Sequence, residues 1–227
     1  MAEKQASNVD RWLGRETNRT RKALESASRH FDANDTLTVN TLEAVYAQES
    51  SFGVLLGKRG STGAAGHFKF KPDTARRYGL KVSKQDDQRF DIDRVSSASA
   101  RYLKDLNTWF GKRTKLSEGL HTVPVVSASE RKKFALGAFN AGEGRIAGAQ
   151  RRANEAGRNS QLWKDVAPYL PRETQQYIEK VSRYEAEFAL KSPANKKLKQ
   201  QSARKGQYRC TVGHWRTIDD RPVFICA

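Results

Sequence analysis

The residue best suited to chemistry is Glu49, a carboxylic acid at the end of an otherwise apolar helical stripe. The stripe has the i, i+3, i+4, i+7 spacing of one helix face: Leu42, Val45, Tyr46 and Glu49. Thr38 or Asn40 can cap this helix, and Gly53 can end it. Burial raises the pKa of a carboxyl group, which is how a general acid for a glycosidic oxygen is made. The competing interpretation is an ordinary exposed glutamate at a helix end.

Three later segments contain turns and polar groups that a substrate cleft could use. Residues 60–70 form a Gly- and Ala-rich loop, and small residues let a backbone approach a ligand closely. A helix that begins near Ser129 breaks at residues 140–144, and another begins at Pro171 and carries an aromatic stripe that includes Tyr177. Taken singly, each segment is better explained as a turn or as a core aromatic than as part of a site.

In their order along the chain, these segments resemble the soluble lytic transglycosylase and goose-type lysozyme family. The matching stretches are residues 47–53 for the family's Glu-Ser helix end, 63–69 with 72–75 for its Gly-Leu-Met-Gln loop, 98–103 for its connecting helix, 138–142 for its Ala-Tyr-Asn-Ala-Gly turn, and 173–178 for its final motif. The resemblance covers residues 37–190. It implies a mainly α, lysozyme-like helical domain.

The resemblance implies cleavage of the β-1,4 bond between N-acetylmuramic acid and N-acetylglucosamine in peptidoglycan, with Glu49 as the sole acid and base. The substrate's own acetamido group would assist, as in the exceptions to the two-carboxylate rule. Glu49 would protonate the leaving oxygen. It would then deprotonate either the sugar's 6-hydroxyl, giving a 1,6-anhydro product, or a water, giving hydrolysis.

The resemblance also implies a supporting set of residues. Those expected to bind substrate or support the site are Ser50, Thr62, Gly66, Lys69, Asn140 and Tyr177. Asn140 would hold substrate and the Gly66 backbone would line the cleft. The Tyr177 hydroxyl would orient the acid, and Ser50 would support the helix end.

Two positions depart from the family's pattern. Lys69 stands where the family usually has Gln, and a cation within about 6 Å of Glu49 would lower the pKa of its carboxyl group. Phe139 stands where the family usually has Tyr, which removes a hydroxyl group with little change in volume. Asp73 and Glu143 are the second carboxylates available.

Composition divides the chain into four expected parts. Residues 1–36 form an N-terminal helical extension, and residues 37–190 form the lysozyme-like transglycosylase catalytic domain. Residues 191–206 are polar and basic, as in a linker. Residues 207–227 have the pattern of a strand, a turn and a strand, which predicts a small C-terminal β-hairpin.

Both cysteines of the chain, Cys210 and Cys226, lie in the hairpin segment. A disulfide between them would close a loop of 15 residues, which contributes about 3 kcal/mol in the chain-entropy model. Two strands alone are marginally stable in water, so we expect this disulfide to join them. Buried free thiols are the alternative in a reducing compartment. No metal or cofactor is expected, because the four histidines never have an HExxH spacing and the cysteines match no zinc pattern.

The chain is strongly basic, with 42 Lys and Arg against 25 Asp and Glu, a formal net charge of +17. Expected partners are peptidoglycan glycan strands, with anionic wall polymers or outer-surface lipids as further candidates. The alternative from another class is a basic nucleic-acid-binding module without catalysis. Such modules interleave aromatic and basic residues on one platform, whereas most aromatics here fall on helix stripes, so no stable nucleic-acid partner is expected. Within the enzyme class the alternative is a hydrolytic goose-type lysozyme. A monomer is expected.

The place of action follows from the expected substrate. No apolar run approaches the roughly 18 residues that span a bilayer, and residues 1–7 lack the apolar stretch of a secretory signal. We expect action at the cell wall or periplasm. The enzyme would be released by lysis, delivered by a secretion system, or recorded without its signal.

Overall fold

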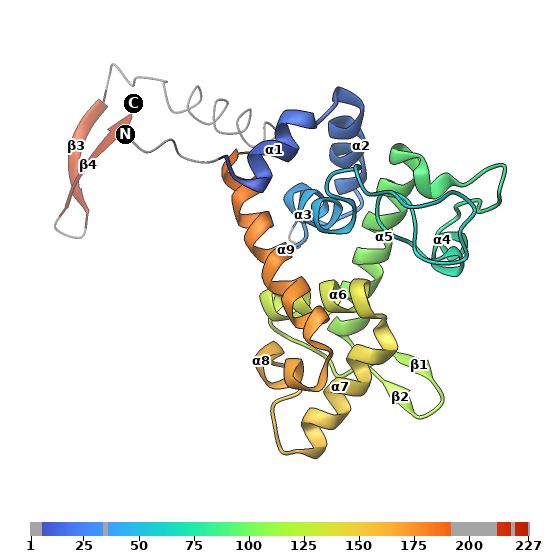
Figure 1. The fold of residues 1–227 in the computed structure, drawn as a ribbon. Helices are drawn as coiled ribbons and strands as arrows, with labels where there is room; N and C mark the ends of the chain where they lie inside the picture. The colour runs from blue at the N-terminus through green and yellow to red at the C-terminus, as the bar shows by residue number, and fades with distance from the viewer. Residues whose placement is uncertain (1–5, 34–35, 192–212, 219–220, 227) are drawn as a thin grey trace. The chain divides into compact units, whose positions relative to one another are not determined.

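A computed structural model describes residues 6–33, 36–191, 213–218 and 221–226. The chain forms two compact units, Met1–Leu190 and Lys191–Ala227. The first is mainly α, which confirms the predicted fold class (Figure 1). Its elements are α1 (Asn8–Arg15), α2 (Asn18–Ser28), α3 (Val39–Ser50), α4 (Pro72–Arg77), η1 (Gln88–Phe90), α5 (Ile92–Gly111), β1 (Lys115–Ser117), β2 (Leu120–His121), α6 (Ala128–Ala141), α7 (Glu143–Glu155), α8 (Trp163–Val166), η2 (Ala167–Tyr169) and α9 (Arg172–Lys191).

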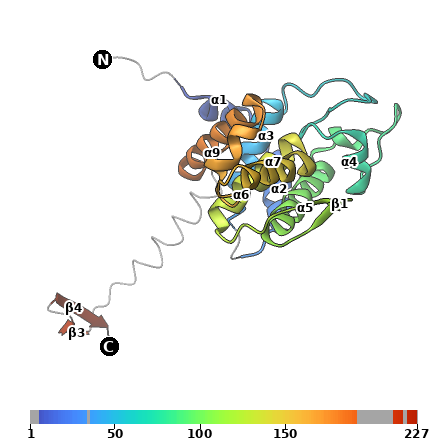
Figure 2. The same cartoon turned by 90° about the horizontal axis from the view of Figure 1, so that it is seen from below.

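Helix α5 is the centre of the first unit. The Asp91 side chain caps its start by accepting hydrogen bonds from two backbone amides of the first turn. Apolar residues at helical spacing are fully buried along its length, among them Val95, Leu103, Leu106 and Phe110. They pack against α2 on one side and α6 on the other, and the three helices lie side by side (Figures 1 and 2). Each such side chain stabilises the fold by about 1.5–3 kcal/mol.

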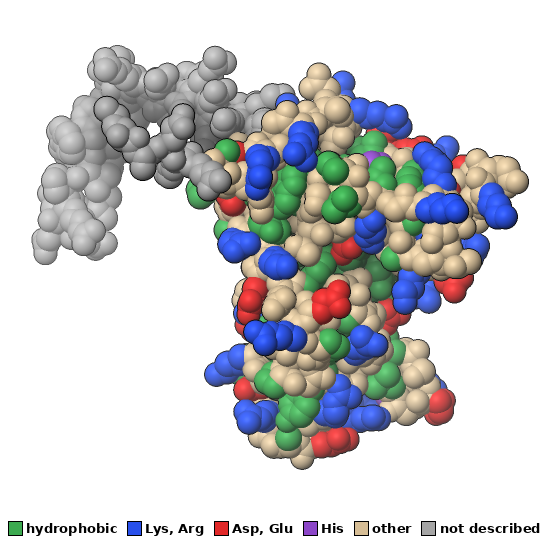
Figure 3. Space-filling model, in the orientation of Figure 1, with side chains coloured by type: hydrophobic (Ala, Val, Ile, Leu, Met, Phe, Trp, Pro, Cys, Tyr) green, Lys and Arg blue, Asp and Glu red, His purple; other side chains and the backbone are tan. Residues whose placement is uncertain are grey.

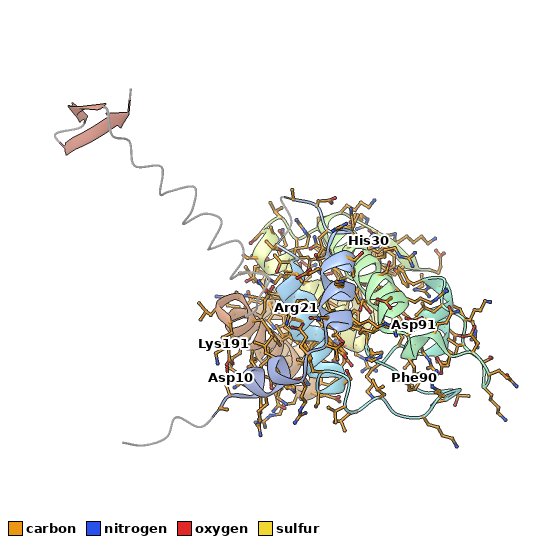
Figure 4. All side chains as sticks on the ribbon, turned by 90° about the horizontal axis from the view of Figure 1, so that it is seen from above. Asp10, Arg21, His30, Phe90, Asp91 and Lys191 are labelled. Carbon is orange, nitrogen blue, oxygen red and sulfur yellow. The ribbon has the colours of Figure 1, made fainter. Side chains whose placement is uncertain are left out.

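The N-terminal helices belong to the same core, which differs from the expected extension over residues 1–36. Trp12 of α1 packs edge-on against Tyr184 of α9, with ring centroids 4.9 Å apart. Leu24 of α2 is fully buried, as its predicted helix face requires. Hydrogen bonds tie α2 to α5, because the Arg19 side chain donates to Asp91 and Asp93 near the start of α5 and the His30 ring bonds Ser97 further along it. Figure 4 labels Asp91 and His30.

A short two-stranded sheet, β1 and β2, fills part of the longer connection between α5 and α6. The Thr122 hydroxyl fastens it to the end of α5 by bonding to the carbonyl oxygens of Trp109 (2.9 Å) and Lys112 (2.8 Å). The sequence did not predict these strands. They are too short to show an alternating pattern. Packing against α7 stabilises them, because their local strand propensity is not sufficient.

The second unit contains an antiparallel hairpin of β3 (Gly213–Ile218) and β4 (Arg221–Cys226). Its register pairs Gly213 with Cys226 and Ile218 with Arg221. The two predicted strands are therefore confirmed over these residues. Cys210 and the expected linker after Lys191 lie outside the described residues, so the disulfide stays a prediction.

Candidate active site

Glu49 lies in the last turn of α3, where the chain makes a sharp left-handed turn. Ser51, Phe52 and Gly53 all have positive φ angles, of 49°, 60° and 86°. A Cβ at Gly53 would overlap the Tyr46 hydroxyl, so this position requires glycine. Two non-glycine residues in this conformation are costly, and such backbone strain is typical of functional sites. The turn therefore fixes Glu49 at the end of a rigid, buried helix.

The predicted helix-end residue, Ser50, is fully buried directly beneath this turn. Its hydroxyl donates to the Tyr46 carbonyl oxygen (3.2 Å) and accepts from the Gly53 amide (3.1 Å). These bonds satisfy backbone groups that would otherwise be left without partners where the helix ends. Ser50 thus joins the helix to the left-handed turn, and its side chain makes no contact with Glu49 that the structure describes.

The Glu49 carboxyl group is partly buried and accepts a hydrogen bond from the Tyr177 hydroxyl of α9, with 2.8 Å between the hydroxyl and Oε1. Burial raises the pKa of Glu49 to about 7, against opposing effects of the Tyr177 hydrogen bond and the Lys69 charge, while Glu173 adds to the rise. Tyr177 is itself buried, with 4% of its surface exposed. The arrangement places a carboxyl group that can give or take a proton near neutral pH.

Glu49 opens onto a cleft of about 440 Å³. One wall is the loop before α4 together with α4 itself, and the other is the junction of α6 and α7. The lining residues are Glu49, Ala64, Phe68, Lys69, Phe70, Lys71, Thr74, Arg77, Tyr102, Phe139, Asn140, Ala141, Gly142 and Glu143. The surface in Figure 3 is hollowed at this level, between the part around α4 and the part around α7. A groove with two carboxyl groups, those of Glu49 and Glu143, and several other polar side chains suits an extended polar chain such as a glycan.

Three of the predicted residues line the cleft: Glu49, Lys69 and Asn140. The others lie behind it or away from it. Lys69 and Asn140 line opposite walls near Glu49, and Tyr177 lies behind the acid. Thr62 is exposed on the loop and is not among the lining residues. Gly66 is buried and also does not line the cleft, because its φ of 81° turns its missing Cβ toward the Arg89 carbonyl oxygen. Its small size permits close approach of another backbone segment, not of the ligand.

The loop wall is held by a buried ion pair that sequence reasoning missed. Arg89 is fully buried and donates to the carbonyl oxygens of Ser61 (2.8 Å), Gly63 (2.8 Å) and Phe70 (3.0 Å). The same guanidinium pairs with Asp87 at 2.8 Å. Burial alone would raise the pKa of Asp87, but hydrogen bonds from Arg89 and the Gly60 amide outweigh it and lower the pKa. No sequence pattern distinguishes this arginine from the many exposed ones.

The second carboxylates considered from the sequence have different surroundings. Glu143 lines the cleft and is held by the Tyr102 hydroxyl (3.2 Å) and by Arg77 (3.3 Å). Asp73 is 96% exposed and pairs with Arg76 of its own helix. Phe139 packs on Phe70 and Tyr102, with ring centroids 5.7 and 5.4 Å away, so an aromatic floor remains without the hydroxyl that the family usually carries.

Two searches of the described residues gave negative results. No group of three or more His, Cys, Asp or Glu side chains within them could hold a metal ion. No helix within the described ranges is both long and apolar enough to cross a membrane.

Comparison with known proteins shows the family of this chain. The model of the transglycosylase SLT domain matches residues 27–162, more than half of the chain. Two relatives are both named membrane-bound lytic murein transglycosylase D, one from Escherichia coli K12 and one from Escherichia coli O6:H1. Each is 31% identical over 118 residues, which cover 52% of this chain and 22% of the relative. The matched part is thus about a fifth of those proteins. The resemblance seen in the sequence is confirmed: the chain belongs to the transglycosylase SLT domain family.

Proposed function

We propose that this protein is a lytic transglycosylase that cleaves the β-1,4 bond between N-acetylmuramic acid and N-acetylglucosamine in peptidoglycan. The observation that supports this most is Glu49, whose pKa is raised to about 7 and which opens onto a polar cleft in a chain of this family. About half of the Glu49 carboxyl groups then carry a proton at neutral pH. That population is what a general acid requires.

Glu49 acts twice in the proposed reaction. It first gives its proton to the glycosidic oxygen as the bond to C1 of the muramic residue breaks, and the substrate's acetamido group stabilises the developing positive charge. Its carboxylate then accepts the proton of the 6-hydroxyl, whose oxygen bonds to C1. Glu49 is returned in its protonated form, no water is consumed, and the new end is a 1,6-anhydro sugar.

The neighbouring side chains divide the work of positioning. The Tyr177 hydroxyl donates a hydrogen bond to Oε1 of Glu49. Oε2 is therefore the oxygen that contacts the substrate in the proposed reaction. Asn140, on the opposite wall, offers an amide that both donates and accepts hydrogen bonds to a sugar. Phe139 and Tyr102 give that wall an apolar surface on which a sugar face can pack.

Digestion of purified sacculi, followed by mass spectrometry of the soluble sugars, tests the proposal. Products lighter by one water than the hydrolysed fragments identify transglycosylation, and fragments carrying that water identify the hydrolytic alternative. Glu49→Gln keeps the side-chain shape but removes the proton donor, so it should lower the rate at least about 100-fold. A rate above about a hundredth of wild type in folded Glu49→Gln protein contradicts the assignment.

Glu143→Gln is the matched control, because it changes the other carboxylate of the cleft in the same way. Glu143 is already held by Arg77 and Tyr102, so this variant should keep at least about a tenth of the wild-type rate. Equal losses in the two variants would require a two-carboxylate mechanism and would exclude Glu49 as sole acid and base.

The proposed partners follow from the same substrate. On the face drawn in Figure 3, Lys and Arg side chains are spread among Asp and Glu side chains and do not form one continuous basic patch of the kind that binds nucleic acid. We therefore assign the net charge of +17 to binding of anionic wall polymers or outer-surface lipids by a monomer. Sedimentation with sacculi at several salt concentrations checks this, because such binding weakens as salt rises.

A further inference from the structure

One wall of the cleft carries three cations. Lys69 and Lys71 come from the loop before α4, and Arg77 comes from the last turn of α4. Within the part of the chain that the structure describes, Arg77 pairs with Glu143 across the cleft, whereas the Lys69 and Lys71 side chains make no hydrogen bond or ion pair. Lys69 and Lys71 therefore line the cleft with no carboxylate of the described residues ion-paired to either side chain.

The backbone of Lys69 has a strained, left-handed conformation. Its φ is 51°, a left-handed conformation that glycine or asparagine adopts far more readily than lysine. Among the described residues only Ser51 and Phe52, in the turn after Glu49, share this feature without being glycine. Its ammonium group lies beside Gly57, where a Cβ would be 3.6 Å from Nζ. Strain of this kind persists only where the surrounding structure holds the backbone in place, and it clusters at functional sites.

We infer that Lys69 and Lys71, with Arg77 beside them, form a subsite for a carboxylate carried by the glycan strand. The inference rests on the proposed function, since it names the feature of the strand that this cleft recognises. A muramic residue whose peptide has been removed carries a free lactyl carboxylate. A muramic residue with its peptide carries the carboxylates of the stem, and N-acetylglucosamine carries none.

Binding of that carboxylate would also act on Glu49. The pKa of Glu49 is set by burial of its carboxyl group and by three neighbours: Tyr177, Lys69 and Glu173. Of these neighbours only Lys69 is a cation. A substrate carboxylate at Lys69 offsets its charge, so Glu49 holds its proton more firmly in the complex than in the free enzyme. The acid then becomes better protonated when a charged strand is in place.

Calorimetric titration of Glu49→Gln protein tests the subsite without turnover. Three soluble ligands are used: neutral oligomers of N-acetylglucosamine, glycan oligomers freed of peptide, and glycan oligomers that keep their stems. A second substitution, Lys71→Gln, in the Glu49→Gln protein should weaken binding of a carboxylate-bearing ligand about 3- to 5-fold, as for a partly screened ion pair. It should leave the affinity for the neutral oligomer unchanged. Adding Lys69→Gln instead should weaken binding of the carboxylate-bearing ligand about 10-fold, because this cation is less exposed. Lys81→Gln, an exposed lysine away from the cleft, should change nothing.

The outcomes separate the two sources of the carboxylate. Loss confined to the peptide-free oligomer identifies the lactyl group, and loss confined to the stem-bearing oligomer identifies the stem. Equal effects of Lys71→Gln on charged and neutral ligands, or no effect on any ligand, overturn the inference. Failure of the wild-type protein to cleave sacculi would instead overturn the proposed function, while the binding ratios would still decide the subsite.

Discussion

The two walls of the cleft are built in different ways. Residues 139–143 lie where α6 ends and α7 begins, so regular helix hydrogen bonds place them. Residues 61–71 contain no helix or strand, and the side chain of Arg89, from outside the loop, holds the carbonyl oxygens of Ser61, Gly63 and Phe70. The helical wall resists local change because many weak interactions fix it. The loop wall is held by contacts with residues outside it, and the Arg89 guanidinium makes three of them. Lys69, which replaces the family's usual residue, lies on this wall.

Replacement of Arg89 should break the loop wall and produce the largest effect on stability. Arg89→Met leaves the Asp87 carboxylate buried without its cation and removes one donor from each of three carbonyl oxygens, so unfolding should become easier by about 3–5 kcal/mol. Urea denaturation measures this change. The control on the helical wall is Lys133→Met in α6, whose partly exposed pair with Glu130 should contribute less than about 1 kcal/mol. Similar losses in the two variants would show that the walls do not differ as described.

The acid between the walls should reduce stability as pH rises. Below about pH 4.5 Glu49 is protonated in both folded and unfolded chains, and its burial then has no electrostatic cost. Above that pH the unfolded chain ionises first, so the folded state loses stability until pH passes about 7. Glu49→Gln should therefore be more stable than wild type by up to about 3 kcal/mol at pH 8, at 1.4 kcal/mol per pKa unit, and equal to it at pH 4. Thermal unfolding at the two pH values checks the difference, and an equal difference at both would contradict a raised pKa.

How much of this arrangement the sequence predicts depends on the distance over which the interactions act. The Glu49 helix and the Asn140 turn follow from apolar spacing and glycine placement, both local signals. Arg89 looks like any other charged residue in a loop, because its three acceptors lie 19 to 28 positions earlier in the chain. The family resemblance implies that the Gly66 backbone lines the cleft, and only the fold shows that the Arg89 backbone is what approaches this glycine.

The N-terminal helices illustrate the same limit. Helix α1 has eight residues, too few to show a periodic pattern strongly, and its membership of the core depends on Trp12 meeting α9 near the end of the domain. The hairpin strands were predictable from their alternation. The pairing of Cys210 with Cys226 remains a prediction, which titration of thiols in the unfolded, unreduced protein would decide.

Tyr177→Phe tests the hydrogen bond from α9 to Glu49, which comes from neither wall of the cleft. The variant removes the hydrogen bond to Oε1 but keeps the ring that buries Glu49, so the rate on sacculi should fall about 10-fold, less than for Glu49→Gln. The same bond lowers the pKa of Glu49, so the alkaline limb of the pH profile should move upward. A loss as large as that of Glu49→Gln would mean that Tyr177 does more than orient the acid.

The smaller of the two expected shifts in the pH profile comes from Lys69→Gln, which restores the family's usual residue on the loop wall. The Lys69 charge lowers the pKa of Glu49, so its removal should let the carboxyl group keep its proton to higher pH. Because the protonated form is the acid, the alkaline limb of kcat/KM against pH, which reports the free enzyme, should move upward by less than about one pH unit across a solvated cleft. Lys71→Gln is the control, since Lys71 is not among the groups that shift the pKa of Glu49. Equal shifts in the two variants would show a general effect of charge on the cleft, whereas a shift in Lys69→Gln alone would show that the loop wall tunes the acid.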